Sequence, residues 1–248
     1  MSLAHLRSFL FTDPLIVLLT IGFGTVSLVA TLFDSSGRLP NKISRSWARW
    51  LLRVSGVRLT VTGLEKINPH ESYVFVANHR SYMDTPVVLA SLPMEFRFFA
   101  KKGLFQIPFL GTHLNRAGHL AVPRGDARAS VKTMTLGAEL IRERKISVLL
   151  FPEGGRSRTG AMREFKEGAA YIAIKGSVPV VPLGICGTRA VLPWGSARVR
   201  PGHVYLKIGD PISTTTMTLK DRQQLTETLV HQVAELAGEP PEQIESPR

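Results

Sequence analysis

The sequence predicts an α/β fold, a mostly parallel sheet flanked by helices, with a membrane-anchoring helical segment at the N-terminus. Three observations lead to this prediction: 44% of the 248 residues are apolar, β-rich runs alternate with helical runs after residue 57, and a long uncharged stretch precedes them. Such alternation is typical of a sheet covered by helices. The single cysteine, Cys186, excludes an internal disulfide and argues against a cysteine-based zinc site.

The first expected element is the uncharged stretch PLIVLLTIGFGTVSLVATLF at residues 14–33. Its length meets the roughly 20 residues that a helix needs to cross a hydrocarbon core about 30 Å thick. A cleaved signal peptide would have a shorter apolar run and a small-residue cleavage site, and a buried helix of a soluble domain is the other alternative. We expect membrane insertion, and both a full crossing and insertion into one leaflet fit the pattern.

The second element is a basic segment, because residues 38–58 contain six Lys or Arg and no acid. On a helix of about 100° per residue, its cations and its apolar residues fall on separate faces. The apolar face holds Ile43, Trp47, Trp50, Leu51 and Val54, and the basic face holds Lys42, Arg45, Arg49 and Arg53. This pattern predicts an interfacial helix on anionic lipid, with a surface helix packed on the core as the alternative.

The net charge of +12 indicates anionic partners. Nucleic acid is a poor fit, since no recognised binding motif is present and an apolar 20-residue stretch has no role in such binding. Membrane lipids are therefore the expected partners. Because basic residues favour the cytoplasmic side of a membrane, we expect the chain after residue 33 to lie there.

The remaining elements divide the chain into an anchoring segment (1–56), an α/β domain (57–238) and a polar tail (239–248). The expected strands are 58–62, 73–77, 96–100, 119–122, 146–151, 178–185 and 204–208. The expected helices are 84–91, 126–143, 164–175 and 219–236. Asp126 is a plausible N-cap for the second of these helices, whose apolar face holds Val131, Met134, Ala138 and Ile141.

Function in open α/β sheets gathers beyond the carboxyl ends of strands, which singles out residues 78–84 and 152–160. In the first segment, NHRSYMD, His79 precedes Asp84 by five residues across a turn that enters a helix. A histidine can accept a proton from a hydroxyl, and a carboxylate on its other ring nitrogen fixes the tautomer. The pair indicates a general base, and a structural hydrogen-bonding histidine is the alternative. Neither G-x-S-x-G nor HExxH is present, so no serine triad and no metal are expected.

The second segment, FPEGGRSRTG, combines glycines, arginines and hydroxyls. Gly154 lets the backbone approach a ligand, Arg156 can grip a phosphate with paired donors, and Ser157 can add a hydroxyl. The segment therefore suggests a phosphate cradle. It is not a P-loop, because GxxxxGK[ST] is absent, and a solvated basic turn is the alternative.

Together the two segments resemble the motifs NHxxxxD and FPEGxRS of the glycerolipid acyltransferase family, typified by 1-acylglycerol-3-phosphate O-acyltransferases. The resemblance covers residues from about 57 to 236 and includes four sequence blocks in order. They are NHRSYMD, with Asn78, His79 and Asp84; AKKGLFQIPFLG, with Lys101 and then Arg124; FPEGGRS, with Glu153, Gly154, Arg156 and Ser157; and VPVVPLGI, with Val180 and Pro182. Two positions depart from the family pattern: Gly155 stands where threonine is usual and Gly103 where glutamate is common.

The resemblance implies that residues 57–238 transfer an acyl chain from acyl-CoA or acyl carrier protein to the hydroxyl of a lysophospholipid, without an acyl-enzyme or cofactor. His79 would act as the base and Asp84 would orient it. Arg156, with Lys101 and Arg124, would hold the acceptor phosphate, and Glu153 would orient the loop or the acceptor. The first choice of acceptor is 1-acylglycerol 3-phosphate, which gives phosphatidic acid. Alternatives are glycerol 3-phosphate, another lysophospholipid, a lyso-ornithine-type lipid, or a non-catalytic lipid-binding role.

Overall fold

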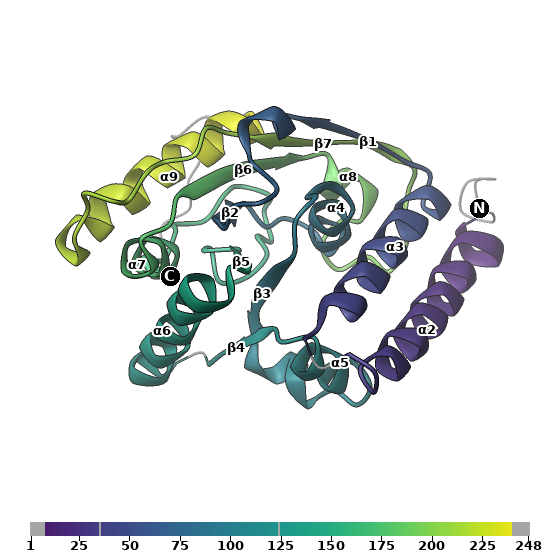
Figure 1. Cartoon of the computed structure of the whole chain (residues 1–248). Helices are drawn as coiled ribbons and strands as arrows, with labels where there is room; N and C mark the ends of the chain where they lie inside the picture. The colour runs from purple at the N-terminus through teal and green to yellow at the C-terminus, as the bar shows by residue number, and fades with distance from the viewer. Residues whose placement is uncertain (1–7, 35, 124, 240–248) are drawn as a thin grey trace.

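The computed structural model describes residues 8–34, 36–123 and 125–239 and confirms the α/β class. A seven-stranded sheet has the order β1-β7-β6-β2-β5-β3-β4 (Figure 1). Its strands are β1 (Val57–Thr62), β2 (Val74–Ala77), β3 (Phe96–Lys101), β4 (Leu120–Val122), β5 (Ser147–Leu150), β6 (Val180–Cys186) and β7 (Gly202–Ile208). All the expected strands are present, and neighbouring strands run parallel except at the antiparallel β6–β7 pair.

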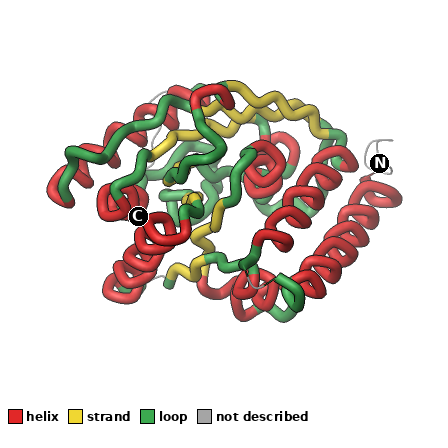
Figure 2. The backbone as a smooth tube through the Cα atoms, in the orientation of Figure 1, coloured by secondary structure: helices red, strands yellow, loops and turns green. Residues whose placement is uncertain are grey.

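Helices cover both faces of the sheet (Figure 2). They are α2 (Asp13–Ala30), α3 (Arg38–Val54), α4 (Asp84–Ser91), α5 (Leu110–Arg116), α6 (Ala127–Arg144), α7 (Gly168–Gly176), α8 (Thr188–Val191) and α9 (Arg222–Ala237). Short turns of other helical types are η1 (Ser8–Thr12), η2 (Leu64–Lys66), η3 (Lys102–Gln106) and η4 (Leu219–Asp221). Helices α3 and α4 pack on one face and α6, α7 and α9 on the other, so the domain has three layers.

The fully buried strand β2 shows how the sequence produces these layers. Successive side chains of a strand point to opposite faces. Phe75 and Ala77 accordingly belong to the core beneath α3 and α4, whereas Val74 and Val76 belong to the core beneath α6, α7 and α9. A strand covered on both faces reads as an uninterrupted apolar run, which the sequence VFVA is.

The sheet register brings together the two loops that the sequence singled out. Strands β2 and β5 are parallel neighbours, with Val76 opposite Leu150. Their carboxyl ends therefore lie side by side at one edge of the sheet. The loop of residues 78–83 enters α4 from that edge, and the loop of residues 151–167 leads from the same edge to α7.

Helix α3 joins the N-terminal segment to the domain and corrects the expected helical face. Leu51 packs into the core together with Ala48 and Leu52, while Trp50 is 48% exposed. Trp47 turns toward α2, where its Nε1 donates to Thr20 Oγ1 at 3.1 Å. The residues of the predicted apolar face therefore have three different environments: Leu51 lies in the core, Trp47 contacts α2, and Trp50 is exposed to solvent. This happens because α3 packs against both the sheet and α2.

Helix α2 leaves most of its apolar surface uncovered as it runs alongside α3 (Figure 1). Residues 10–30 form a helix long and apolar enough to cross a membrane, with 11% of the most apolar window buried. The exposed apolar side chains on this helix and just beyond it are Leu15, Val17, Leu18, Ile21, Val26, Val29, Leu32 and Phe33. These side chains together are called the uncovered face of α2. Its exposure disagrees with a buried core helix, which was one of the sequence alternatives.

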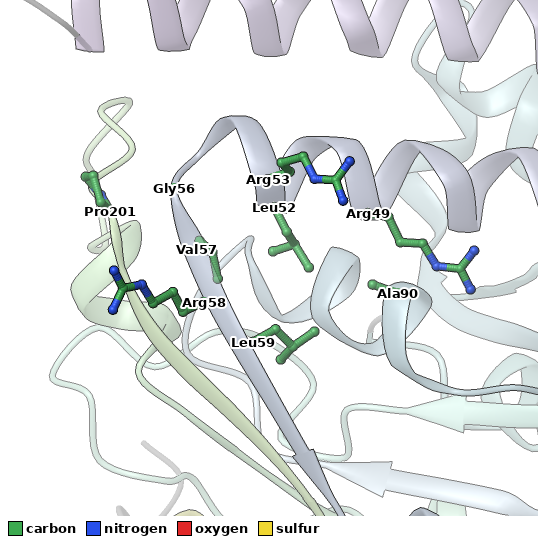
Figure 3. Close-up of a pocket in the computed structure, with 9 residues that line it drawn as sticks. All are labelled: Arg49, Leu52, Arg53, Gly56, Val57, Arg58, Leu59, Ala90 and Pro201. Carbon is green, nitrogen blue, oxygen red and sulfur yellow. The ribbon is translucent and has the colours of Figure 1, made fainter.

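A pocket of about 600 Å³ lies where the end of α3, the start of β1 and α4 meet (Figure 3). Leu52, Leu59 and Ala90 line its apolar part, and Arg49 and Arg53 lie one helical turn apart above it. The guanidinium of Arg53 also lies 5.2 Å from the centre of the Trp50 ring. The exposed basic residues of α3 therefore lie beside apolar surface, as on the predicted interfacial helix.

Three local details differ from the sequence expectation. Helices α5 and α8 and the turns η2 and η3 were not predicted. Helix α7 begins at Gly168 instead of residue 164, because Lys166 N donates to Pro152 O at 3.0 Å and holds the preceding segment against the β5 loop. On α6, Asp126 caps the helix by accepting from Ala129 N at 2.9 Å, as predicted, but Val131 is 52% exposed.

Candidate active site

The imidazole of His79 and the carboxylate of Asp84 face each other at the end of β2. His79 Nδ1 lies 2.8 Å from Asp84 Oδ2. A carboxylate only accepts hydrogen bonds, so Nδ1 holds the proton and Nε2 keeps its lone pair. The Asp84 side chain is 1% exposed and that of His79 is 17% exposed. The geometry therefore aims a proton-accepting nitrogen toward solvent, with its buried partner behind it.

Asp84 is held in place by the loop that connects it to His79. Its Oδ2 also accepts from Arg80 N at 2.7 Å and Ser81 N at 2.9 Å. Asp84 is the first residue of α4, where the helix dipole stabilises negative charge. These contacts explain why the two residues stand five apart: the turn between them wraps around the carboxylate.

A second carboxylate, Glu153, connects the two loops. Its Oε1 accepts from His79 N at 2.5 Å and its Oε2 accepts from Arg163 N at 3.1 Å. Burial raises the pKa of Glu153 to about 8, although both backbone N–H groups oppose the shift. Both oxygens already have protein donors and the residue is 3% exposed. Of the two roles that the resemblance implied, this geometry fits orienting the loop.

Two neighbours fix the plane and the backbone of His79. The Phe151 ring stacks on the imidazole, with centroids 4.1 Å apart and planes 18° apart. Asn78 is fully buried and joins β2 to β6, since its Nδ2 donates to Ile185 O at 2.9 Å and its Oδ1 accepts from Ile185 N at 2.8 Å. Asn78 is therefore a structural residue of the motif. Phe151 is the first residue of the motif FPEGxRS, and no role was predicted for its ring from the sequence.

The glycine- and arginine-containing loop lies against His79. Ser157 N donates to His79 O at 3.2 Å. Gly154 has a φ of +68°, a conformation that favours glycine. The Ser157 side chain is fully buried, and its hydroxyl accepts from Gly160 N at 2.9 Å. Ser157 therefore shapes the turn, and its predicted contribution of a hydroxyl to a phosphate cradle stays a prediction.

Arg156 projects from this loop between two aromatic rings. Its guanidinium carbon lies 3.4 Å from the centre of the Tyr82 ring and 4.3 Å from the centre of the Trp194 ring. Tyr82 belongs to the His79 loop, and Trp194 follows α8. The sequence analysis gave no role to either ring. Tyr82 occupies an unassigned motif position, and Trp194 lies outside all four motif blocks.

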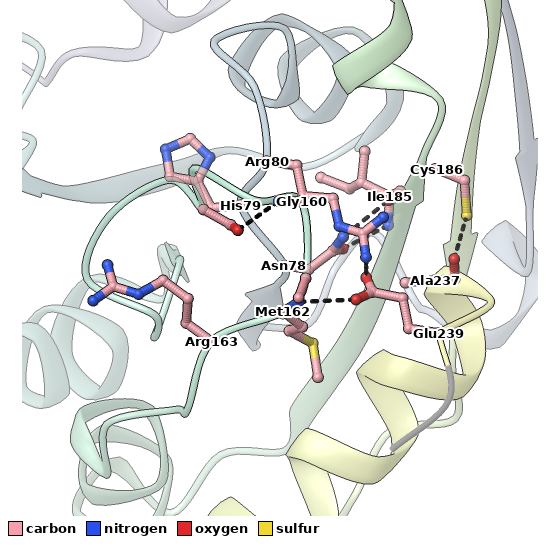
Figure 4. A network of polar contacts seen from close by, with 12 residues as sticks. Asn78, His79, Arg80, Gly160, Met162, Arg163, Ile185, Cys186, Ala237 and Glu239 are labelled. Carbon is pink, nitrogen blue, oxygen red and sulfur yellow. Dashed lines mark hydrogen bonds and ion pairs between the residues drawn. The ribbon is translucent and has the colours of Figure 1, made fainter. Parts of the chain in front are cut away.

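Arg80 connects the site to the C-terminal segment (Figure 4). Its guanidinium forms an ion pair with Glu239, whose Oε2 also accepts from Met162 N at 3.0 Å. The Glu239 side chain is 7% exposed, so the polar tail begins after Glu239 and not at it. The other tail residues, 240–248, lie outside the described residues.

Lys101 and Arg124 are the remaining residues predicted to bind the substrate. Lys101 is exposed at the end of β3, at the same sheet edge as His79 but separated from β2 by β5. Arg124 lies outside the described residues. Within the described ranges, no group of three or more His, Cys, Asp or Glu side chains could hold a metal ion.

The buried dyad, the cross-linked loops and the parallel sheet define an acyltransferase-type site. A family model described as "Acyltransferase" matches residues 58–186, and the chain belongs to this family. The match includes the His79, Asp84 and Arg156 positions but ends before Trp194.

Relatives include the chloroplastic 1-acyl-sn-glycerol-3-phosphate acyltransferase LPAT1 of Arabidopsis thaliana. It is 35% identical over 201 residues, covering 80% of this chain and 54% of that protein. The chain thus spans about half the length of this relative. The 1-acyl-sn-glycerol-3-phosphate acyltransferase of Saccharomyces cerevisiae is 28% identical, covering 87% and 75% of the two chains.

The chain is also similar to a crystal structure of the 1-acyl-sn-glycerophosphate acyltransferase PlsC from Thermotoga maritima. The TM-score is 0.76 at 26% identity, and the match covers 94% of this chain and 98% of the other. The similarity therefore includes the N-terminal helices as well as the α/β domain.

Proposed function

We propose that the protein transfers an acyl chain from a thioester donor to the free hydroxyl of 1-acylglycerol 3-phosphate, giving phosphatidic acid. The observation that supports this most strongly is the 2.8 Å contact between His79 Nδ1 and Asp84 Oδ2 beside the Arg156 loop. The names of the relatives point to the same acceptor. A base without an adjacent nucleophile favours direct transfer.

His79 acts as the general base in this proposal. Nε2 takes the proton from the acceptor hydroxyl while the hydroxyl oxygen attacks the thioester carbonyl. Asp84 stabilises the imidazolium that forms, and the Phe151 ring keeps the imidazole in its plane. A positioned general base contributes about 10²- to 10⁴-fold to a rate.

The reaction ends with breakage of the C–S bond. The carbonyl carbon gains the ester bond to the acceptor oxygen, and the tetrahedral intermediate expels the thiolate of the donor. His79 returns its proton to that sulfur, so the base is regenerated and no acyl-enzyme forms. Acyl-CoA and acyl carrier protein both supply the required thioester, and we retain both as donors.

Arg156 holds the phosphate of the acceptor. Its guanidinium carbon lies close to two aromatic rings, which cannot accept all five of its N–H groups in plane, so these groups can make the paired contacts that phosphate oxygens accept. The sequence resemblance assigns Lys101, at the end of β3, and Arg124, which lies outside the described residues, to the same anionic group. Glu153 positions this loop relative to His79 through its two backbone contacts.

The N-terminal helices hold the enzyme at the membrane that contains its acceptor. The uncovered face of α2 enters the apolar layer, and the exposed arginines of α3 meet anionic headgroups. The excess of basic residues after α2 favours the cytoplasmic side for the catalytic domain. The net charge of +12 then favours anionic acceptors, donors and lipids together.

A product assay tests this proposal. Purified protein is incubated with 1-acylglycerol 3-phosphate and either acyl-CoA or acyl carrier protein, and the products are identified by mass spectrometry. Parallel reactions contain glycerol 3-phosphate, lysophosphatidylcholine or a lyso-ornithine lipid. We expect phosphatidic acid as the main product. A higher kcat/KM with another acceptor would contradict the assignment of the acceptor, and no product with any acceptor would favour the non-catalytic alternative.

A further inference from the structure

The aromatic slot around Arg156 is built by three loops that are far apart in the sequence. Tyr82 comes from the loop after β2, Arg156 from the loop after β5, and Trp194 from the segment after α8. The slot is defined by the rings of Tyr82 and Trp194, which lie 3.4 and 4.3 Å from the guanidinium carbon. Arg158 also approaches the Trp194 ring, at 5.6 Å.

Hydrogen bonds between the loops fix the positions of the two rings. Ser81 Oγ donates to Leu192 O at 2.8 Å, which joins the Tyr82 loop to the Trp194 segment. Arg189 Nη2 donates to Arg158 O at 2.9 Å, which joins α8 to the Arg156 loop. Ser81 is fully buried, so its contact is shielded from water. The slot is therefore preformed by the protein without a ligand.

The stacking leaves a particular part of Arg156 available. Arginine has five N–H donors in the plane of its guanidinium, and a contact of the guanidinium face with an aromatic ring leaves these donors available. Among the described residues, no ion pair or protein hydrogen bond involves these donors, and the same loop supplies a second guanidinium, that of Arg158. Both rings remain partly exposed, Tyr82 at 65% and Trp194 at 38%, so the edge of the slot is open to a ligand.

We propose that Tyr82 and Trp194 are positioning residues that orient Arg156 toward a phosphomonoester and make the site selective for it. This inference rests on the proposed function. Two aromatic rings could also receive a quaternary ammonium group, which stacks in aromatic cages. Here the Arg156 guanidinium already occupies the slot. A choline headgroup is therefore excluded from the rings and repelled by a like charge. A phosphate dianion instead meets paired N–H donors.

Substitution of the rings tests the positioning role through the acceptor KM. We expect Trp194→Ala and Tyr82→Ala each to raise the KM for 1-acylglycerol 3-phosphate about three- to tenfold, the range that loss of one cation–π contact gives. Neither should change kcat or the donor KM more than about twofold. Trp194→Phe keeps a ring and should restore the KM. Trp194→Ala in an Arg156→Ala background should add little, because the ring then has nothing to orient.

Tyr171→Ala is the matched control. Tyr171 lies under a different cation, Lys175 Nζ at 5.4 Å, on α7, and its loss should leave the acceptor KM unchanged. A fall in kcat with an unchanged acceptor KM in Trp194→Ala would overturn the inference. So would a Trp194→Phe variant as defective as Trp194→Ala at equal Tm.

A binding measurement separates this inference from the proposed reaction. The chain has three tryptophans, so Trp47→Phe/Trp50→Phe leaves Trp194 as the single tryptophan. We expect glycerol 3-phosphate to change Trp194 fluorescence and glycerophosphocholine to leave it unchanged, with no response in Arg156→Ala. Equal responses to both probes, or no response to glycerol 3-phosphate, would overturn the inference. Absence of acyl transfer by the wild type with a normal fluorescence response would reject only the proposed reaction.

Discussion

The loop cluster around His79 and the uncovered face of α2 are built in opposite ways. In the loop cluster, one buried carboxylate oxygen gathers several protein donors: Asp84 Oδ2 accepts from His79 Nδ1, Arg80 N and Ser81 N, while Asp84 Oδ1 has no hydrogen-bond partner among the described residues. On α2, apolar side chains such as Leu18 at 66% and Phe33 at 82% exposure have no cover. The comparison shows that the protein itself holds the side chains of the loop cluster in place, whereas among the described residues nothing covers the apolar side chains of α2.

Because of this difference, substitutions in the loop cluster and substitutions on the uncovered face of α2 should affect different measured properties. Changes in the loop cluster should lower turnover or stability without altering membrane association. Changes on the uncovered face of α2 should alter membrane association without altering the chemistry.

Asp84→Asn should lower kcat by about 10²- to 10⁴-fold, because an amide no longer fixes the His79 tautomer or stabilises the imidazolium. Steady-state assays in detergent micelles measure this effect, and flotation with liposomes should be unchanged. Asp126→Asn is the matched control, since Asp126 also lies at a helix N-terminus but far from the dyad in sequence. Comparable kcat losses in the two variants would contradict the role of Asp84.

Leu18→Asp/Ile21→Asp/Val29→Asp should move the protein from the membrane to the soluble fraction. Each charge in an apolar layer costs on the order of 3 kcal/mol, so three change the partition coefficient by far more than a hundredfold. Sedimentation of washed membranes measures the effect. The control is Val131→Asp/Leu136→Asp, since both side chains are exposed and apolar on α6. Retention of the α2 variant in the membrane would reject the anchor.

The structure also changes how the anchor must be tested. Deleting the whole N-terminal segment would remove Leu51 and Leu52, which belong to the core. Such a deletion would expose core surface and confuse loss of folding with loss of anchoring. Substitution of exposed α2 residues avoids this problem.

Glu239→Gln should lower the free energy of unfolding by about 2 to 4 kcal/mol, because the largely buried Arg80 guanidinium loses its ionised partner. For a chain of this size, the Tm should fall by roughly 5 to 15 °C. Thermal denaturation followed by circular dichroism measures the change, and Glu235→Gln, an exposed residue one turn earlier, is the control. An unchanged Tm would show that the Arg80–Glu239 ion pair does not contribute to the stability of the folded chain.

The sequence predicted the repeating parts of the fold because they follow simple periods. Apolar runs such as VFVA marked buried strands, and the His79 and Arg156 loops followed from their places after two such runs. Helix α5 was missed because it begins after Phe109, whose positive φ (+70°) gives no sequence signal. Trp194 and Glu239 belong to segments without a recognised motif. Their contacts with the site form only in the tertiary structure, so the sequence could not predict these contacts.

Glu153→Gln should give a smaller, pH-dependent change in stability. Burial raises the pKa of Glu153 from 4.5 to about 8, so the folded state binds this proton more tightly than the unfolded state. The wild type therefore loses stability from this group as the pH rises from about 4.5 to about 8, and glutamine does not. The difference in Tm, variant minus wild type, should increase by several degrees between pH 5.5 and pH 8.5. A difference independent of pH would contradict the buried, protonatable carboxyl.

The most direct test of the central claim is the kcat of His79→Ala for phosphatidic acid formation, compared with the exposed control His70→Ala. If His79 Nε2 removes the proton from the acceptor hydroxyl, kcat falls by about 10²- to 10⁴-fold, while the Tm and the binding of glycerol 3-phosphate stay close to wild type. A folded His79→Ala enzyme that retains more than about a third of the wild-type kcat would contradict the account.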